Sequence, residues 1–208
     1  MIKRIIFDID NTLMDFPKNY EIHFEKILKK HGSNLSGTDL YNAIGNYERY
    51  KSNTYYDKNK LLEIINKELN TNFTIDIVND FFEMYNKLIT PIPSETVDTL
   101  EYLSTKYEIV AYTNWFTETQ ISRLKEAGIL HYFKEIYGAD KIPLKPRKEG
   151  FLKVIDGFNL DECIMIGDNL EVDIKVPYEM GMNVFHLNKF GTSKYPTIKK
   201  IEELKERL

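Results

Sequence analysis

The chain has 208 residues, of which 42% are hydrophobic and 29% are charged, and its formal net charge at pH 7 is −4. This length can bury a core and fits one large or two small domains. The acidic balance disfavours a nucleic-acid polymer as partner, because proteins that bind one usually carry a basic surface. No apolar stretch approaches the ~18 residues of a membrane span, and the single Cys163 excludes an internal disulfide framework. We therefore expect a cytoplasmic protein without a membrane partner.

The first predicted element is a strand over residues 4–10, RIIFDID, which ends in two acids. Its apolar run closes at Asp8, too early for a secretory signal peptide. Successive side chains of a strand face opposite ways, so Asp8 and Asp10 are expected on the same side. When two carboxylates lie so near each other, each raises the pKa of the other unless a cation or a proton lies between them. The pattern indicates a functional pair, and simple capping of the following turn is the alternative.

Between residues 16 and 91 the only predicted elements are helices, separated by turn-like segments. Its apolar periodicity predicts helices at about 18–31, 38–51, 58–69 and 75–89. We therefore predict an all-helical domain over 16–91, inserted into an α/β core that is formed by 1–15 and 92–208.

A tyrosine-rich patch lies within this insert, next to Arg49. Its members are Tyr41, Tyr47, Tyr50, Tyr55 and Tyr56. Aromatic side chains on helices usually serve packing, so packing inside the insert is favoured over stacking on a base or sugar. Arg49 and Phe16 are kept as candidate substrate contacts.

From residue 92 onward, short apolar runs alternate with helical patterns. The runs are 107–114, 135–140, 162–168 and 183–187. Their weak alternation is typical of strands that are buried on both faces of a parallel sheet. The predicted fold class is therefore α/β, a doubly wound parallel-sheet (Rossmann-like) core with the helical domain inserted after its first strand.

The helices between these runs have recognisable ends. Thr117 and Gln120 form a capping-box sequence, and the helix that they open ends at Gly128. Another helix ends at Gly181, and a last amphipathic helix is predicted over 198–208. The four histidines lack the spacing of metal ligands, so packing or surface roles are expected for them.

Polar side chains follow several of the predicted strands. Those that could carry chemistry are Asp8, Asp10, Thr113, Asn114, Lys145, Asp168 and Asp173. In an open parallel sheet, ligands bind beyond the carboxyl ends of the strands, where the strand order reverses. Several carboxylates at one spot suit a hard cation such as Mg²⁺, and a lysine with a hydroxyl suits phosphate oxygens. Each residue alone has a bland interpretation as a turn, helix-start or surface residue.

Four motifs in chain order resemble those of the haloacid dehalogenase-like superfamily, chiefly its aspartate-nucleophile phosphatases. They are DIDNT at 8–12, Thr113 with Asn114, Lys145 with Pro146, and GDNLEVD at 167–173. The insert is similar to that family's helical (C1-type) cap, which closes over the active site. An acid at position 10 favours phosphate chemistry, because the dehalogenases of the family lack it and a departing halide needs no proton.

The resemblance implies a role for each of these residues. Asp8 is the nucleophile, and Asp10 is the general acid and base. Mg²⁺ is held by the Asp8 side chain, the Asp10 backbone carbonyl and Asp168, and Asp173 supports this shell. The phosphoryl oxygens are held by Thr113, Asn114 and Lys145.

The resemblance leaves several functions open. The segment DNTLMDF at 10–16 looks most like nucleoside 5′-monophosphate phosphatases, with a sugar-phosphate or phosphoglycolate phosphatase as the alternative. A phosphomutase would use the same scaffold. A phospho-aspartate signalling module or an inactive binding module are the alternatives outside enzymes. The expected partner is a small phosphorylated metabolite, and the expected state is a monomer or a homodimer.

Overall fold

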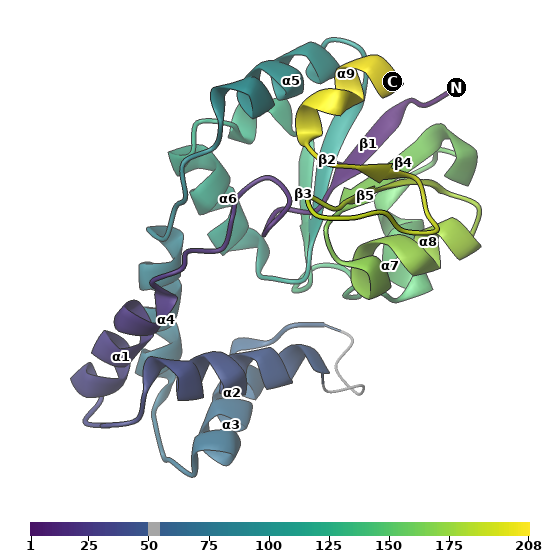
Figure 1. Ribbon diagram of the computed structural model, residues 1–208. Coiled ribbons are helices and arrows are strands. Elements are labelled where there is room, and N and C mark those ends of the chain that lie inside the picture. The colour runs from purple at the N-terminus through teal and green to yellow at the C-terminus, as the bar shows by residue number, and fades with distance from the viewer. Residues whose placement is uncertain (50–54) are drawn as a thin grey trace. The chain divides into compact units, whose positions relative to one another are not determined.

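The computed structural model describes residues 1–49 and 55–208, without the side chains at 46, 48 and 49. These residues form two compact units (Figure 1). The core unit comprises Met1–Phe16 with Thr90–Leu208, and the helical unit comprises Pro17–Ile89. Each unit is described by itself.

The core unit is built on a parallel sheet. In the part of the chain that the structure describes, its strands are β1 (Arg4–Phe7), β2 (Glu108–Thr113), β3 (Glu135–Gly138), β4 (Cys163–Gly167), β5 (Asn183–Leu187) and β6 (Thr197–Ile198). Their order across the sheet is β3-β2-β1-β4-β5-β6, and every neighbouring pair is parallel. The order reverses between β1 and β4, which is where a doubly wound sheet opens a ligand crevice. The predicted fold class is confirmed.

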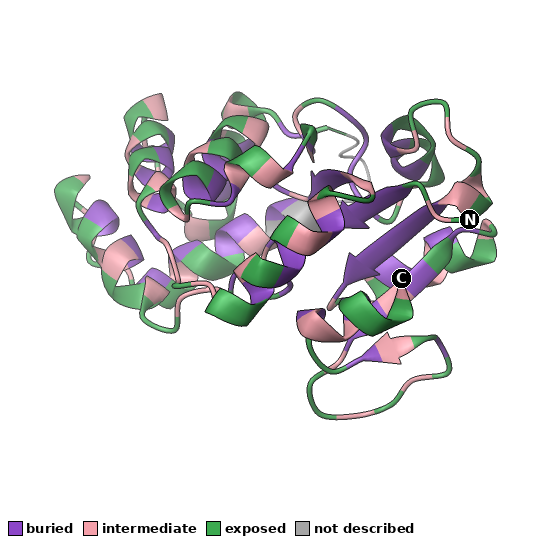
Figure 2. Ribbon diagram, turned by 90° about the horizontal axis from the view of Figure 1, so that it is seen from above, coloured by how far each residue is buried: buried purple, intermediate pink, exposed green. Residues whose placement is uncertain are grey.

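The central strands are buried on both faces, which explains their nearly continuous apolar sequences (Figure 2). Ile6 of β1 lies beside Val110 of β2 and Met165 of β4. These three side chains belong to one core cluster with Phe151 and Val154 of helix α7, which spans Lys148–Val154. The alternate residues of each strand face the opposite layer, so both layers are held by the same short runs.

Helices cover both faces of the sheet, as Figure 1 shows. They are α5 (Ser94–Ser104), α6 (Thr117–Glu126) and α9 (Leu204–Arg207) on one face, and α7 (Lys148–Val154) and α8 (Lys175–Glu179) on the other. Short helical turns lie at Leu130–Tyr132, Leu160–Glu162, Leu170–Ile174 and Ile201–Glu203.

The C-terminal segment differs from its prediction as one helix over 198–208. It begins instead with strand β6, whose Thr197 and Ile198 lie beside His186 and Leu187 of β5. Helical turns follow only from Ile201. Two residues of strand leave no periodicity in the sequence, so pairing with the sheet edge decides their conformation.

The helical unit contains α1 (Tyr20–Lys30), α2 (Gly37–Arg49), α3 (Lys58–Leu69) and α4 (Ile75–Asn86). The predicted helices are confirmed over the described residues, with ends that differ by a few residues, and positions 50–51 of the second predicted helix lie outside the described residues. Asp57 caps α3, because its Oδ1 accepts hydrogen bonds from the backbone N–H groups of Asn59 and Lys60. Among the described residues, no helix combines the length and the apolar character needed to cross a membrane.

The tyrosines of the insert divide between packing and exposure. Tyr47 and Tyr56 are buried with ring centroids 4.6 Å apart, and the Tyr47 hydroxyl accepts from the Asp57 backbone N–H at 2.7 Å. Tyr47 and Tyr56 thus pack inside the insert, as predicted, whereas Tyr41 and Tyr55 are exposed. Tyr50 and the Arg49 side chain lie outside the described residues.

Candidate active site

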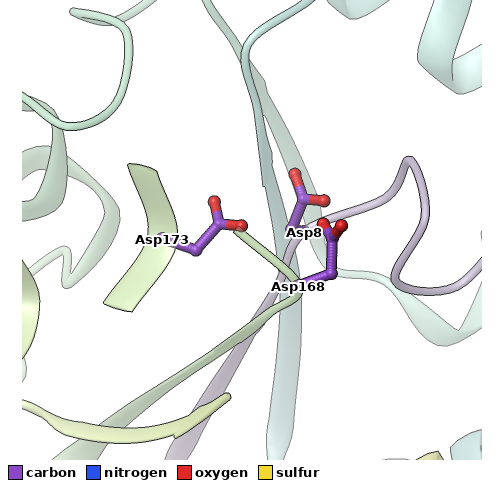
Figure 3. Close-up of side chains that lie close together, drawn as sticks. All are labelled: Asp8, Asp168 and Asp173. Carbon is purple, nitrogen blue, oxygen red and sulfur yellow. The ribbon is translucent and has the colours of Figure 1, made fainter. Parts of the chain in front are cut away.

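An acidic cluster lies at the carboxyl ends of β1 and β4, where the strand order reverses. Asp8 directly follows β1, Asp168 directly follows β4, and Asp173 comes from the helical turn after it (Figure 3). Each contributes a carboxylate oxygen, and these oxygens lie within 4.8 Å of one another. Three acids that are distant in sequence therefore converge, as the strand-end argument predicted.

A glycine makes room for one of these acids. A side chain at Gly167 would place its Cβ 2.5 Å from the Cβ and the carboxyl carbon of Asp173. The bare backbone allows Asp173 to lie against the end of β4, where its Oδ2 accepts from the Asn169 N–H at 3.1 Å. The glycine in this motif is thus a packing requirement of the cluster.

Lys145 joins two of the acids from the loop after β3. Its Nζ lies 2.6 Å from Asp8 Oδ1 and 2.7 Å from Asp173 Oδ1. The lysine is only 2% exposed, so its ammonium has left bulk water. Burial alone would lower the pKa of Lys145, but the charges of Asp173 and Asp8 outweigh burial and raise it. Lys145 is therefore a fixed positive charge.

The three acids of the cluster, of which Asp168 is partly exposed, outnumber the single ammonium of Lys145. Burial, with the charge of Asp173 added, raises the pKa of Asp8 to about 7 although Lys145 opposes this. Burial and the charge of Asp8 raise the pKa of Asp168 to about 6. Burial also raises the pKa of Asp173. Carboxylate oxygens that are crowded and short of positive charge fit a hard divalent cation, so the cluster could hold a metal ion.

Thr12 connects the two strand ends. Its hydroxyl donates to Asp8 Oδ2 at 3.1 Å and accepts from the Asp168 backbone N–H at 3.1 Å. The residue is buried. Thr12 lies in the motif DIDNT, but no role was predicted for it, and its spacing of two residues from Asp10 is the signal in the sequence.

Asp10 has different hydrogen-bond partners from Asp8. Strand β1 ends at Phe7, so Asp10 lies beyond the regular strand. Its carboxylate accepts from Gln120 Nε2 and from Arg123 Nη1, each at 2.7 Å. Neither partner, both on α6, was predicted from the sequence as part of the site.

The predicted capping box of Thr117 and Gln120 is wrong, because both groups have partners outside the helix. The Gln120 side chain bonds Asp10, and α6 has no cap from the side chain of its own N-cap residue, Phe116. Asp140 supplies the cap instead, because its Oδ1 accepts from the Thr117 N–H at 2.6 Å. A residue distant in sequence satisfies the helix end and leaves Gln120 for the site.

The residues after β2 have distinct positions. Thr113 is buried, and its Oγ1 accepts from Gln120 Nε2 at 3.0 Å. The Asn114 amide donates to the Lys145 carbonyl at 2.8 Å, and its side-chain oxygen accepts from the Lys145 N–H at 2.7 Å. Asn114 thus fixes the loop that presents Lys145.

Two further residues adjoin this region. His186 of β5 is buried, and its Nε2 lies 3.0 Å from the Asp168 backbone carbonyl oxygen, so it braces that strand end. Phe16 is half-buried, and its N–H donates to the side chain of Asn11 at 2.9 Å. Asn11 has a φ of 61°, a conformation that asparagine and glycine tolerate better than other residues.

Comparisons with known proteins agree with this geometry. The family model described as haloacid dehalogenase-like hydrolase matches residues 5–187. The chain is 25% identical to pyrimidine 5′-nucleotidase PynA of Streptococcus pneumoniae, over 89% of this chain and 84% of that protein. It is also 25% identical to a glyceraldehyde 3-phosphate phosphatase of Methanocaldococcus jannaschii, over 88% of this chain and 83% of that protein.

A solved structure shares the fold. HAD-hydrolase YfnB from Bacillus subtilis, bound to magnesium, gives a TM-score of 0.79 at 21% identity and covers 99% of this chain and 98% of that one. The chain therefore belongs to the haloacid dehalogenase-like hydrolase family. The relatives named as a nucleotidase and as phosphatases support a phosphoric monoester hydrolase. The predicted family and the predicted class of enzyme are thus confirmed.

Proposed function

We propose that this chain is a Mg²⁺-dependent phosphomonoester hydrolase that forms an aspartyl phosphate on Asp8. Its substrate is a small soluble metabolite, with a nucleoside 5′-monophosphate as the first candidate. The observation that carries the proposal is the buried cluster in which Lys145 bonds Asp8 and Asp173 beside Asp168. A carboxylate held against an ammonium at a strand end is poised for attack on phosphorus.

The proposed ligands of Mg²⁺ are the side chains of Asp8 and Asp168 and the backbone carbonyl of Asp10, with Asp173 in support. Bound there, the ion would supply positive charge opposite the phosphoryl oxygens. The crowding of carboxylate oxygens within 4.8 Å supports this assignment. The magnesium-bound YfnB structure supports the choice of metal.

In the first step, an Asp8 oxygen attacks phosphorus and the bond from phosphorus to the leaving oxygen breaks. Protonated Asp10 gives its proton to that oxygen, which departs as an alcohol. In the second step, ionised Asp10 takes a proton from a water molecule whose oxygen attacks the phosphoryl group. The bond to Asp8 breaks, inorganic phosphate leaves, and Asp10 is protonated again.

The phosphoryl oxygens are assigned to Lys145, Thr113 and Asn114. An ammonium has three donors, and Lys145 directs two of them at Asp8 and Asp173, which leaves one for phosphate. The Thr113 oxygen accepts from Gln120, so its own hydrogen is free for donation. Because the Asn114 side chain is engaged with Lys145, its phosphate contact is assigned to its backbone N–H.

The substrate choice depends on the segment 10–16 and on the relative PynA, a pyrimidine 5′-nucleotidase. A second candidate is a short sugar phosphate, because several relatives are glyceraldehyde 3-phosphate phosphatases. The helical unit is proposed as the cap, with Phe16 and Arg49 as candidate substrate contacts.

A phosphate-release screen with Mg²⁺ present tests the proposal. The panel comprises nucleoside 5′-monophosphates, sugar phosphates, glyceraldehyde 3-phosphate and phosphoglycolate. The expected result is the highest kcat/KM on a nucleoside 5′-monophosphate, and a much higher value on another class would replace the substrate assignment. No release from any phosphomonoester would refute the hydrolase.

Two variants test the nucleophile. Asp8→Asn should abolish turnover because an amide is a poor nucleophile, and the exposed control Asp161→Asn should retain it. A phosphoryl-Asp8 that survives for hours would favour a signalling module. A need for a bisphosphate activator would favour a phosphomutase.

A further inference from the structure

Helix α6 buries two polar side chains beneath the loop that follows β1. Gln120 and Arg123 are both fully buried, with 0% of each exposed. They are three residues apart, so they lie on the same face of the helix. A guanidinium and an amide are strongly disfavoured in the interior unless hydrogen bonds satisfy them. Both side chains are directed at Asp10.

The three side chains form a closed ring of hydrogen bonds. Arg123 Nη1 donates to Asp10 Oδ1 at 2.7 Å and to Gln120 Oε1 at 2.8 Å. Gln120 Nε2 donates to Asp10 Oδ2 at 2.7 Å and to Thr113 Oγ1 at 3.0 Å. Each carboxylate oxygen of Asp10 thus receives a donor, which fixes the plane of the carboxyl group. Gln120 also ties Asp10 to the hydroxyl at the end of β2.

A stabilising role alone explains this arrangement poorly. A buried ion pair such as that of Arg123 with Asp10 is often no more stabilising than apolar side chains of similar volume. Arg123 bonds Asp10, the side chain to which the proposed mechanism gives both proton transfers. Gln120 bonds Asp10 as well, and it also contacts Thr113 of the proposed phosphate site. Orientation of a reacting group is what such rigid contacts supply.

We propose that Gln120 and Arg123 are positioning residues that hold the Asp10 carboxyl group for proton transfer and set its place relative to Thr113. This inference rests on the proposed function, because it assigns a supporting role in the same two-step hydrolysis. Neither residue is assigned a contact with the substrate, and both hydrogen-bond the Asp10 carboxylate that transfers the proton. Their effect is exerted through Asp10.

Substrates with different leaving groups can distinguish a positioning role of Gln120 and Arg123 from a general role in stabilising the fold. p-Nitrophenolate departs without a proton, so formation of the aspartyl phosphate from p-nitrophenyl phosphate does not need Asp10 as an acid. An alkyl phosphate such as glycerol phosphate does need it. Hydrolysis of the aspartyl phosphate needs Asp10 as a base with both substrates. A displaced Asp10 should therefore slow aspartyl-phosphate formation from glycerol phosphate and aspartyl-phosphate hydrolysis with either substrate. It should not slow aspartyl-phosphate formation from p-nitrophenyl phosphate.

The experiment compares Gln120→Leu, Arg123→Met and Arg123→Lys with the wild type in rapid-mixing measurements. The exposed control on the same helix is Lys125→Met. In the Leu and Met variants, formation of the aspartyl phosphate from p-nitrophenyl phosphate should stay within ~3-fold of the wild type. Steady-state turnover, and both steps with glycerol phosphate, should fall ~10–10²-fold, a part of the ~10²–10⁴ that acid–base catalysis supplies. Arg123→Lys should recover much of the loss, and Lys125→Met should equal the wild type.

Equal losses in every step, or no loss in Gln120→Leu, would overturn the proposal. Gln120→Leu removes no charge, so it remains informative if Arg123→Met fails to fold. A wild type that releases phosphate from no phosphomonoester, nucleoside 5′-monophosphates included, would instead refute the proposed function.

Discussion

The Lys145 ammonium lies 2.6 Å from Asp8 Oδ1, and both groups are buried at the carboxyl end of the sheet. This contact gives the proposed nucleophile a permanent cation beside it. Replacing Lys145 with Met keeps the volume of the side chain and removes the charge. We expect kcat to fall by at least ~10²–10³, the loss typical when one electrostatic donor is removed from a reacting centre. Steady-state phosphate release measures it.

The matched control for this variant is Lys141→Met in the same loop. Lys141 is exposed and lies 3.8 Å from Asp140, a surface pair that contributes little. Its activity should stay within ~2-fold of the wild type. Retention of more than about a tenth of kcat by Lys145→Met would contradict the assignment, given the size of the expected loss.

The raised pKa values of the acids predict how stability depends on pH. Asp8, with a pKa raised to about 7, and Asp168, raised to about 6, bind protons more tightly in the folded chain than in the unfolded chain. Their contribution to the free energy of unfolding is therefore fully present below pH ~4 and is lost as the pH rises from ~4 to ~7. Thermal melts of metal-free protein should show this loss.

Asp8→Asn isolates this effect. An amide carries no charge, so metal-free Asp8→Asn should melt above the wild type at pH 8, by a few degrees for on the order of 1 kcal/mol, and the gain should shrink at pH 5. Added Mg²⁺ should raise the melting temperature of the wild type more at pH 8 than at pH 5, because protons compete for the same oxygens. A Mg²⁺ shift that grows toward low pH would contradict the cluster as a cation site.

Gly167→Ala tests the packing of the cluster. The new methyl group would lie 2.5 Å from the Asp173 side chain, so Asp173 must move and its contact with Lys145 must lengthen. We expect a loss of ~1–3 kcal/mol in stability, as in other overpacked sites, together with a lower kcat.

Gly191→Ala is the comparison for that substitution. The nearest heavy atom to a Cβ at Gly191 lies 3.5 Å away, on Asn188, so the methyl group fits without movement. Its melting temperature and kcat should match those of the wild type. An unchanged Gly167→Ala enzyme would show that Asp173 is not held in place by this close contact.

The parts of the fold that could be predicted from sequence are those with a local cause. The runs that became β1 and β4 are apolar because both faces of the sheet are covered, and the helix ends carry local signals such as the glycine at 128. Asp8 and Asp168 could be predicted because each follows such a run directly. A parallel sheet then brings the strand ends together.

The partners of Asp10 could not be predicted in this way. Gln120 follows Thr117 at the spacing of a capping box, and nothing local indicates that Asp140 caps the helix instead. Arg123 has the sequence context of an exposed helical residue. Its burial follows from packing of α6 beside the loop after β1, which is a contact between distant segments. The bracing of Asp168 by His186 has the same kind of origin.

Thr12 provides the last prediction, because a single hydroxyl connects the two acids proposed to hold the metal. It donates to Asp8 and accepts from the Asp168 N–H. Thr12→Val keeps the shape of the side chain, leaves the part-buried Asp168 N–H without this partner and removes the link. We expect Mg²⁺ affinity, measured by titration calorimetry, to fall ~10-fold, the lower end of what supporting hydrogen bonds contribute at metal sites. Thr12→Ser retains the hydroxyl and should bind Mg²⁺ within ~3-fold of the wild type, so equal losses in both variants would assign the effect to the methyl group and not to the hydroxyl.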